Sequence, residues 1–374
     1  MHKTASWFGH KHILLLLSLL SLLSTGFGPS VLTDSDMPVR RVTPYQLRMM
    51  REIPSPELSA PAYILANAAT GEILLAKNMH ERRSVASMTK MVTALVALER
   101  GRQDQMVTIE ARDLRGVYSV MLLRSGEELT LRQLLFMLLI SSDNAAANAI
   151  ARAVAGDVRT FVGWMNEYAQ RMGLADTHFA NPYGYDHPEN YSSAFDMAII
   201  GRLAMANPVI ADIVRRPEAI AAWRNLISTN ELLNTYSGAI GIKTGTTPQA
   251  GECLATMVNR PTGRAISVVM GSEHRFHDTR MLMDYHYANF AELNIALPYN
   301  ALNRYQDLEY NWHAIGLRGS LTVLVKPWQL DTVRVYRQID NIAPNPSQDE
   351  PIGRLIVSLD GRLLTEVPMY ARPD

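Results

Sequence analysis

This chain of 374 residues has little cysteine and no net charge. Its one cysteine, Cys253, excludes an internal disulfide and a cysteine-based zinc cluster, and the apolar residues that follow it favour a buried structural thiol. Lysine plus arginine number 36, as do aspartate plus glutamate. This balance argues against a nucleic-acid partner, which normally requires a basic excess.

The apolar run at residues 13–23 is much shorter than the roughly 20 residues that span a membrane. Lys3 and Lys11 precede it, and the small residues 24–26 follow it. A basic start, a short apolar centre and a small-residue exit are typical of a secretory signal. We therefore expect residues 1–28 to be a cleaved signal peptide and the mature protein to be exported to the periplasm. An uncleaved anchor helix is the alternative.

The order of predicted elements indicates an α+β fold. Residues 29–60 are proline-rich and predict a linker with one short helix after Thr43-Pro44. Apolar periodicity predicts strands at 62–67, 72–76, 239–244, 252–258 and 264–271, and helices at 88–99, 131–140, 143–154, 158–172 and 276–291. Two strands, a long helical insert from about 84 to 235, three strands and a helix favour an antiparallel sheet with an inserted helical lobe.

The pattern changes near residue 294. Residues 319–325, 332–336 and 353–367 are typical of short β-strands, and Asp360-Gly361 predicts a hairpin turn. We expect a main domain at 61–293 and a small all-β domain at 294–374.

Lysine is scarce: only six of the 36 basic residues are lysines. One of them, Lys90, follows Ser87 by three residues at the start of a predicted apolar helix, so both side chains lie on one face. Burial lowers the pKa of a lysine, and a neutral lysine can take the proton of a serine, which arginine cannot do. A serine N-cap beside a surface lysine is the alternative.

Two further segments contain residue types that suit a catalytic site. Ser142 and Asn144, separated by Asp143, lie between two predicted helices and offer a proton shuttle and an amide-binding group, although all three are also preferred N-caps. Lys243 to Thr246 reads Lys-Thr-Gly-Thr at the end of a predicted strand, where an ammonium and a hydroxyl can hold a carboxylate and glycine permits close approach.

Together these segments follow the order Ser-x-x-Lys, Ser-x-Asn, Lys-Thr-Gly, which is the signature of penicillin-binding proteins and class A β-lactamases. With residues 66–78, 173–184 and 241–254 and the terminal strands, the chain resembles the low-molecular-mass penicillin-binding proteins, the D-alanyl-D-alanine carboxypeptidase family. The resemblance implies the β-lactamase/transpeptidase-like fold for the main domain and a β-sandwich for the last one. It also implies a serine D-Ala-D-Ala carboxypeptidase that acts on peptidoglycan stem peptides, is inhibited by β-lactams, and needs no metal or cofactor.

The resemblance assigns a role to each motif residue. Ser87 would be the nucleophile and Lys90 the acylation base, while Ser142 and Asn144 would serve proton relay and the substrate amide. Further roles fall on five residues: carboxylate binding on Lys243, Thr244 and Arg275, and an oxyanion hole built from the backbone N–H groups of Ser87 and Thr246, with Gly245 between the two threonines.

Two alternative activities stay open. A class A β-lactamase needs a glutamate that activates the deacylating water; residues 173–184 contain none, and the nearest string, at Glu231, lies close to Lys243. Asp143 stands where carboxypeptidases of the family commonly have glycine, and an acid there resembles the endopeptidase branch, which cuts crosslinks but usually lacks the β domain. No membrane-surface helix follows the last predicted strand, so we expect no membrane anchor at that end.

Overall fold

The computed structural model describes residues 54–298, 302–340, 342, 344 and 346–372. The predicted signal peptide, most of the predicted linker and the short helix after Pro44 lie outside the described residues. Among the described residues, no single helix is long and apolar enough to cross a membrane. Only the bent pair of helices at 194–206 and 208–214, taken together, meets that test by length and composition.

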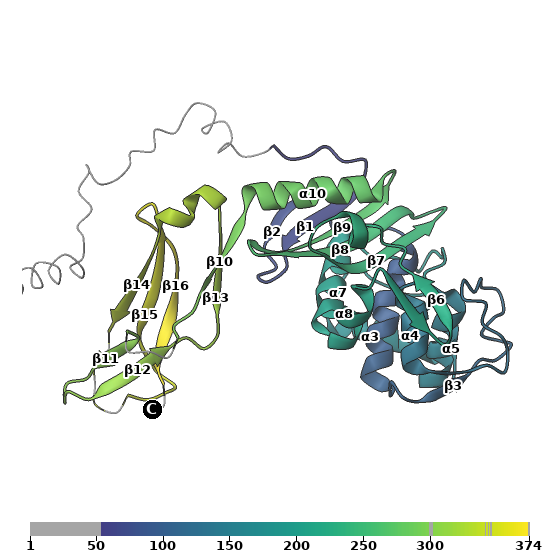
Figure 1. Cartoon of the computed structure of the whole chain (residues 1–374), viewed down its shortest axis with the longest axis horizontal. Coiled ribbons are helices and arrows are strands. Elements are labelled where there is room, and N and C mark those ends of the chain that lie inside the picture. Colours follow the sequence, from purple (N-terminus) through teal and green to yellow (C-terminus); the bar gives the residue numbers. More distant parts are fainter. Residues whose placement is uncertain (1–53, 299–301, 341, 343, 345, 373–374) are drawn as a thin grey trace, which may run out of the picture. The chain divides into compact units, whose positions relative to one another are not determined.

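A five-stranded antiparallel sheet with the order β2-β1-β9-β8-β7 forms the centre of the main domain (Figure 1). Its strands are β1 (Ala62–Asn67), β2 (Ile73–Lys77), β7 (Ala239–Thr247), β8 (Gly251–Arg260) and β9 (Gly263–Ser272). These are the five strands that the sequence predicts, with ends shifted by at most three residues. Strands β1 and β2 precede the helical insert in the sequence and β7, β8 and β9 follow it, so the sheet joins the two ends of this domain.

Both faces of this sheet are covered, which explains why every residue of β1 is buried. Ala62, Ile64 and Ala66 face the core shared with the helical lobe. Tyr63 and Leu65 face a second core, formed with helix α10 (Arg275–Asn289) on the opposite side. Side chains that point alternately to the two faces of β1 thus contribute to two apolar cores.

The helical lobe is built from capped helices. Thr130 and Gln133 form a capping box, and Asp143, Asp157 and Asn207 are further N-caps. The helices are η1 (Ala86–Thr89), α3 (Lys90–Arg100), α4 (Leu131–Leu139), α5 (Asn144–Ala155), α6 (Val158–Arg171), α7 (Ala194–Ala206), α8 (Pro208–Val214) and α9 (Leu232–Thr235). The predicted helices at 131–140, 143–154, 158–172 and 276–291 are confirmed to within two residues.

The expectation of a purely helical insert is wrong in two places. Strands β3 (Met106–Thr108) and β4 (Glu128–Thr130) pair with each other, as do β5 (Glu218–Ala221) and β6 (Arg224–Ile227). Ala222 and Trp223, both with positive φ, form the tight turn between β5 and β6. These strands are only three or four residues long, too short for a clear period-two pattern, and neither pair joins the central sheet.

The C-terminal part is all-β, as predicted. A sheet of order β11-β12-β16-β15-β14 and the pair β10-β13 share one apolar core. The strands are β10 (Ala291–Ile295), β11 (Arg304–Gln306), β12 (Trp312–Gly316), β13 (Leu321–Val325), β14 (Val333–Ile339), β15 (Pro351–Leu359) and β16 (Arg362–Ala371), and a 3₁₀ helix η2 covers Pro327–Thr332. Asp360 and Gly361 form the predicted hairpin turn with positive φ. The overall α+β class is therefore confirmed.

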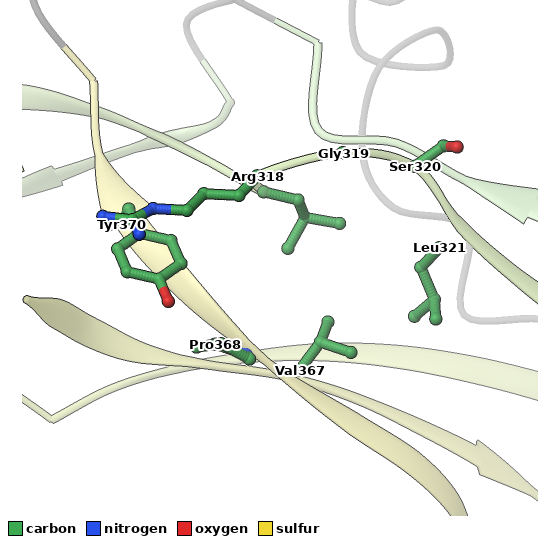
Figure 2. Close-up of a pocket in the computed structure, with 8 residues that line it drawn as sticks. Arg318, Gly319, Ser320, Leu321, Val367, Pro368 and Tyr370 are labelled. Carbon is green, nitrogen blue, oxygen red and sulfur yellow. The ribbon is translucent and has the colours of Figure 1, made fainter. Parts of the chain in front are cut away.

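The expected domain boundary at 293/294 falls inside β10, which pairs with β13. We therefore propose a boundary just before Ala291. This part also has a shallow pocket of about 240 Å³ between residues 317–321 and β16 (Figure 2). Arg318, whose guanidinium lies 4.1 Å from the centre of the Tyr370 ring, is the one charged residue in its lining. The pocket holds none of the predicted site residues.

Candidate active site

Ser87 and Lys90 meet at the junction of η1 and α3. The turn is entered through Ala86, whose φ of 48° is rare for a residue with a Cβ. Ser87 is partly exposed, whereas Lys90 is completely buried. The Nζ of Lys90 lies 2.7 Å from the Oγ of Ser87. The structure therefore brings the two residues of the first motif together.

The surroundings of Lys90 favour its uncharged form. Burial lowers the pKa of Lys90 well below its ordinary value, and the nearby charge of Lys243 lowers it further. The carboxylate of Asp143 opposes this shift to a smaller extent.

Hydrogen bonding then decides where the lone pair of a neutral Lys90 lies. Besides Ser87, its Nζ contacts the Oδ1 of Asn144 at 2.6 Å and the carbonyl oxygen of Tyr183 at 2.9 Å. A neutral amine has two N–H bonds and one lone pair. Because the two carbonyl oxygens can only accept, they take both N–H bonds, and the lone pair remains for the Ser87 hydroxyl. This is the geometry that a general base requires.

In the turn between α4 and α5, helix capping and contact with the catalytic lysine fall on different residues. Asp143 is the N-cap of α5, since its Oδ1 accepts from the Ala146 N–H at 2.8 Å. Asn144 instead contacts Lys90. Ser142 has a left-handed backbone with φ of 61° and is partly buried. Its hydroxyl makes no hydrogen bond with the described part of the chain, so the structure does not join it to the other motif residues.

Strand β7 carries the third motif along the opposite side. Lys243 and Thr244 are buried, and the Lys243 Nζ donates to the Thr244 carbonyl at 3.0 Å. Arg275, the first residue of α10, donates through Nη1 to the Thr246 Oγ1 at 2.6 Å and to the Gly245 carbonyl at 3.0 Å. The structure therefore places Arg275 beside the Lys-Thr-Gly strand.

Gly245 is required by the close approach of β7 to residues 84–89, the turn that carries Ser87 and that we call the nucleophile turn. A Cβ at this position would lie 2.7 Å from the Val85 carbonyl oxygen and 3.1 Å from the Ser87 nitrogen. Any side chain would therefore push the strand away from Ser87. The two backbone N–H groups expected for the oxyanion hole, those of Ser87 and Thr246, belong to these two touching segments.

Two cations gather at this strand, and only Arg275 forms an ion pair with an acid among the described residues. Burial, and then the charge of Arg275, lower the pKa of Lys243 to about 7. No carboxylate of the described residues bonds to Lys243. Glu252 forms a long ion pair with Arg275, 4.0 Å from its Nε, and accepts from the Arg275 backbone N–H at 3.1 Å. Such an arrangement favours binding of an anionic group such as a carboxylate.

Three residues that contribute to the site are not indicated by the sequence motifs. Thr229 shares a short hydroxyl–hydroxyl hydrogen bond with Thr244. Tyr183 supplies the carbonyl beside Lys90. Asp186 accepts from Ser84 at 2.7 Å and from Thr247 at 2.6 Å, and so joins the nucleophile turn to the end of β7. The string Asn-Pro-Tyr-Gly at 181–184 was a usable signal for Tyr183, but a carbonyl contact cannot be read from residue type.

The structure also places the residues behind the alternatives. Glu231 forms an ion pair with Arg280 on α10 at 3.5 Å and is exposed; it makes no contact with a motif residue among those described. The side chain of Asp143 is completely buried, so it is not accessible to a substrate. In the described ranges no three His, Cys, Asp or Glu side chains gather as a metal site.

Comparisons with known proteins agree with this geometry. Residues 49–274 match the family model described as D-alanyl-D-alanine carboxypeptidase. The chain belongs to this family. D-alanyl-D-alanine carboxypeptidase DacF of Bacillus subtilis (strain 168) is 31% identical over 337 residues, which cover 84% of this chain and 85% of that protein. The carboxypeptidase DacA of Haemophilus influenzae is 33% identical over 346 residues, 85% of this chain and 86% of the relative.

Solved structures give the same result. Penicillin binding protein 5 from Haemophilus influenzae superposes with a TM-score of 0.73 at 28% identity, over 86% of this chain and 99% of that one. A mutant of the Streptomyces K15 DD-transpeptidase matches 62% of this chain and 99% of its own at 32% identity, with a TM-score of 0.60. This carboxypeptidase is thus a serine peptidase of the penicillin-binding fold, and the family and fold expected from its three motifs are confirmed.

Proposed function

We propose that this enzyme removes the terminal D-alanine of peptidoglycan stem peptides through an acyl-enzyme on Ser87. The lone pair of Lys90, directed at the Ser87 hydroxyl by the two carbonyl acceptors, is the observation that carries the proposal. Ser87 Oγ attacks the carbonyl carbon of the penultimate D-alanine while its proton passes to Lys90. The N–H groups of Ser87 and Thr246 stabilise the oxyanion, an effect worth about 10²–10³ in rate per donor.

Collapse of this intermediate breaks the C–N bond. The leaving amine of the terminal D-alanine takes the proton that Lys90 received, relayed through Ser142, and the carboxylate of this D-alanine is held by Lys243, Thr244 and Arg275. Water, deprotonated by Lys90, then attacks the ester carbonyl. The bond between the acyl group and Ser87 Oγ breaks, the proton passes to Oγ, and the shortened stem peptide leaves. A penicillin would acylate the same serine.

We further propose that trimming of stem peptides, rather than cutting of crosslinks, is the main activity. The acid that suggests the endopeptidase branch, Asp143, is completely buried, and both of its carboxylate oxygens accept hydrogen bonds from protein groups. Purified enzyme should release D-alanine from a pentapeptide faster than it cleaves a crosslinked dimer. Preferential cleavage of the dimer would establish the endopeptidase instead, and rapid turnover of nitrocefin would establish a β-lactamase.

The proposed substrate lies outside the cytoplasmic membrane. We therefore propose that residues 1–28 direct export and that the mature enzyme works in the periplasm. N-terminal sequencing of the enzyme from its own cells should show a mature chain that begins near residue 29. A mature chain that starts at Met1 would instead show that this segment is retained.

A further inference from the structure

A long irregular segment, residues 109–127, joins β3 to β4 beside the second motif. Connections longer than about 15 residues without regular structure are usually functional or disordered. This one is held by specific contacts. We call residues 117–124 the strap.

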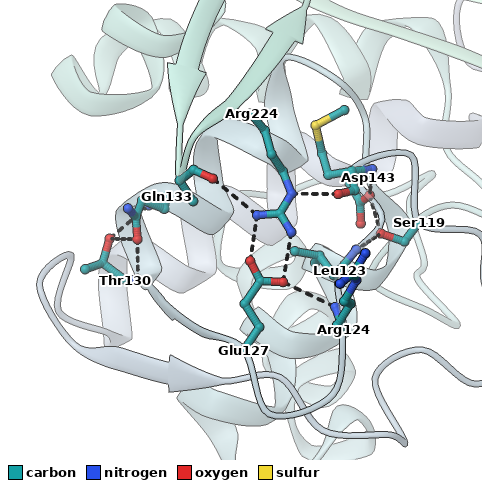
Figure 3. Close-up of polar contacts among 10 residues, drawn as sticks. Ser119, Leu123, Arg124, Glu127, Thr130, Gln133, Asp143 and Arg224 are labelled. Carbon is teal, nitrogen blue, oxygen red and sulfur yellow. Dashed lines mark hydrogen bonds and ion pairs between the residues drawn. The ribbon is translucent and has the colours of Figure 1, made fainter.

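Asp143 fastens the strap to the second motif (Figure 3). Its Oδ2 accepts from the Ser119 hydroxyl at 2.8 Å and from the Met121 N–H at 2.7 Å. Its Oδ1 accepts from Ala146, as the helix cap. The Ser119 hydroxyl in turn accepts from the Leu123 N–H at 3.1 Å, so one carboxylate organises the strap and the start of α5 together.

Two arginines, Arg224 and Arg152, bind other parts of the segment 109–127. Arg224 of β6 donates to the Met121 carbonyl at 2.8 Å and forms a two-pronged ion pair with Glu127. Arg152 of α5 bonds the buried Asp113 through two nitrogens at 2.9 Å. The segment therefore supports α5, the helix that begins with Asn144, at both ends.

We propose that Asp143 is a positioning residue for acylation: by fastening the strap to the turn of Ser142 and Asn144, it holds the Asn144 amide against Lys90. The proposal rests on the proposed function, because Lys90 must be the base for this contact to matter. Asp143 itself is buried, and its hydrogen bonds go to Ser119, Met121 and Ala146 and not to Ser87.

The chemistry of the site requires a carboxylate for this dual contact. Both oxygens face N–H or O–H donors, which a carboxylate can accept at both ends. An asparagine would place its NH₂ group against the N–H of either Ala146 or Met121. Since both groups are donors, that hydrogen bond would be lost. Ser142, held in a left-handed backbone conformation between the strap contact and the cap, needs support from its neighbours.

A double-mutant cycle tests the proposal on the full-length enzyme. The readout is the second-order rate constant for acylation of Ser87 by a labelled penicillin. Ser119→Ala removes a strap contact and leaves the helix cap intact; we expect a loss of about fivefold, the value of roughly one hydrogen bond. Asp143→Asn should cost on the order of 10²-fold, the typical effect of a misplaced catalytic group. The double variant should be no slower than Asp143→Asn alone, because both changes release the same strap.

Asp157→Asn is the matched control, because Asp157 caps α6 outside the site. It should leave acylation within twofold of the wild type, an allowance typical of independent surface sites. An unchanged rate in Ser119→Ala, or losses that multiply in the double variant, would overturn the proposal. Absence of an adduct in the wild-type enzyme would instead overturn the proposed function itself, so the two failures are distinguishable.

The pH profile separates positioning from a purely structural role. Lys90 faces the charges of Lys243 and Asp143 and the neutral groups of Ser87, Asn144 and Tyr183. Removing the anion in Asp143→Asn lowers the pKa of Lys90 further, so the acidic limb of the acylation profile should move to lower pH. Ser119→Ala keeps the anion and should leave the limb in place. An unmoved limb in Asp143→Asn would contradict the proposal.

Discussion

At the level of single residues, the proposed mechanism depends on two buried lysines with different tasks. Lys90 has two carbonyl acceptors and a serine around its nitrogen, so it suits proton transfer. Lys243 has one carbonyl acceptor and a neighbouring guanidinium, so it suits anion binding. Burial lowers the pKa of both lysines. The groups that surround each ammonium determine whether it transfers a proton, as at Lys90, or binds an anion, as at Lys243.

Replacing Lys90 with arginine should abolish acylation while keeping a cation. Arginine does not release its proton in a protein, so the general base is lost, an effect of about 10²–10⁴ in rate. Stopped-flow measurement with a fluorescent penicillin gives the rate constant. Lys77→Arg, on the exposed end of β2, is the matched control and should acylate normally. Acylation of the Lys90→Arg enzyme at the wild-type rate would refute the base assignment.

Substrate affinity should depend on the charge of Lys243. With a pKa of about 7, Lys243 is protonated below neutrality and binds a carboxylate; above pH 7 it loses its proton. The KM for a pentapeptide should therefore rise above pH 7, while kcat changes less. Lys243→Arg keeps its charge at all these pH values and should flatten the KM profile. A wild-type KM that stays constant from pH 6 to 9 would contradict this role.

At the scale of elements, the site is made by contacts between segments that are far apart in sequence. The nucleophile turn is touched by β7 at Gly245 and by the loop of Tyr183 and Gly184. Local patterns predicted the five strands of the central sheet and most helices of the main domain. They could not predict these contacts between segments. A close backbone contact requires a glycine, but the sequence does not show which segment the glycine contacts.

Gly184→Ala should disrupt the nucleophile turn. A Cβ at Gly184 would lie 1.9 Å from the Ala86 carbonyl oxygen, and φ is +94°, so the backbone itself must move. We expect acylation to fall on the order of 10²-fold. Gly173→Ala is the control: φ is +69° but no atom lies within 4 Å, so only conformational strain of about 1 kcal/mol is added. Equal activity of the two variants would show that the contact at Gly184 is not needed.

Helix α10 contains a histidine that makes folding sensitive to acid. Burial, and then the charge of Arg260, lower the pKa of His286 to about 4, whereas an exposed histidine titrates near 6.5. The unfolded chain therefore binds this proton first, and stability falls as pH drops from about 6.5 to 4, by roughly 3 kcal/mol.

Guanidinium unfolding at pH 7 and at pH 4.5 measures this effect. His286→Leu should lose less stability than the wild type over that interval, because the buried group that must remain uncharged is gone. The same loss in both proteins would show that His286 does not titrate as stated.

At the scale of the whole molecule, the three motifs and the order of elements predicted the fold class and the family. Two short strand pairs were missed because three or four residues carry too little pattern. Asp143 shows the other limit: as a residue type it suggested a change in specificity, whereas its buried contacts join the strap to α5. The spacing of residues along the chain cannot distinguish an acid that faces substrate from one that faces protein.

The central claim is that Ser87 forms the acyl-enzyme. Intact-mass and peptide mass spectrometry after incubation with penicillin test it most directly. We predict one added penicillin per chain, on the peptide that contains Ser87, and none in Ser87→Ala. An adduct on another residue, or an unmodified wild-type enzyme, would contradict the account.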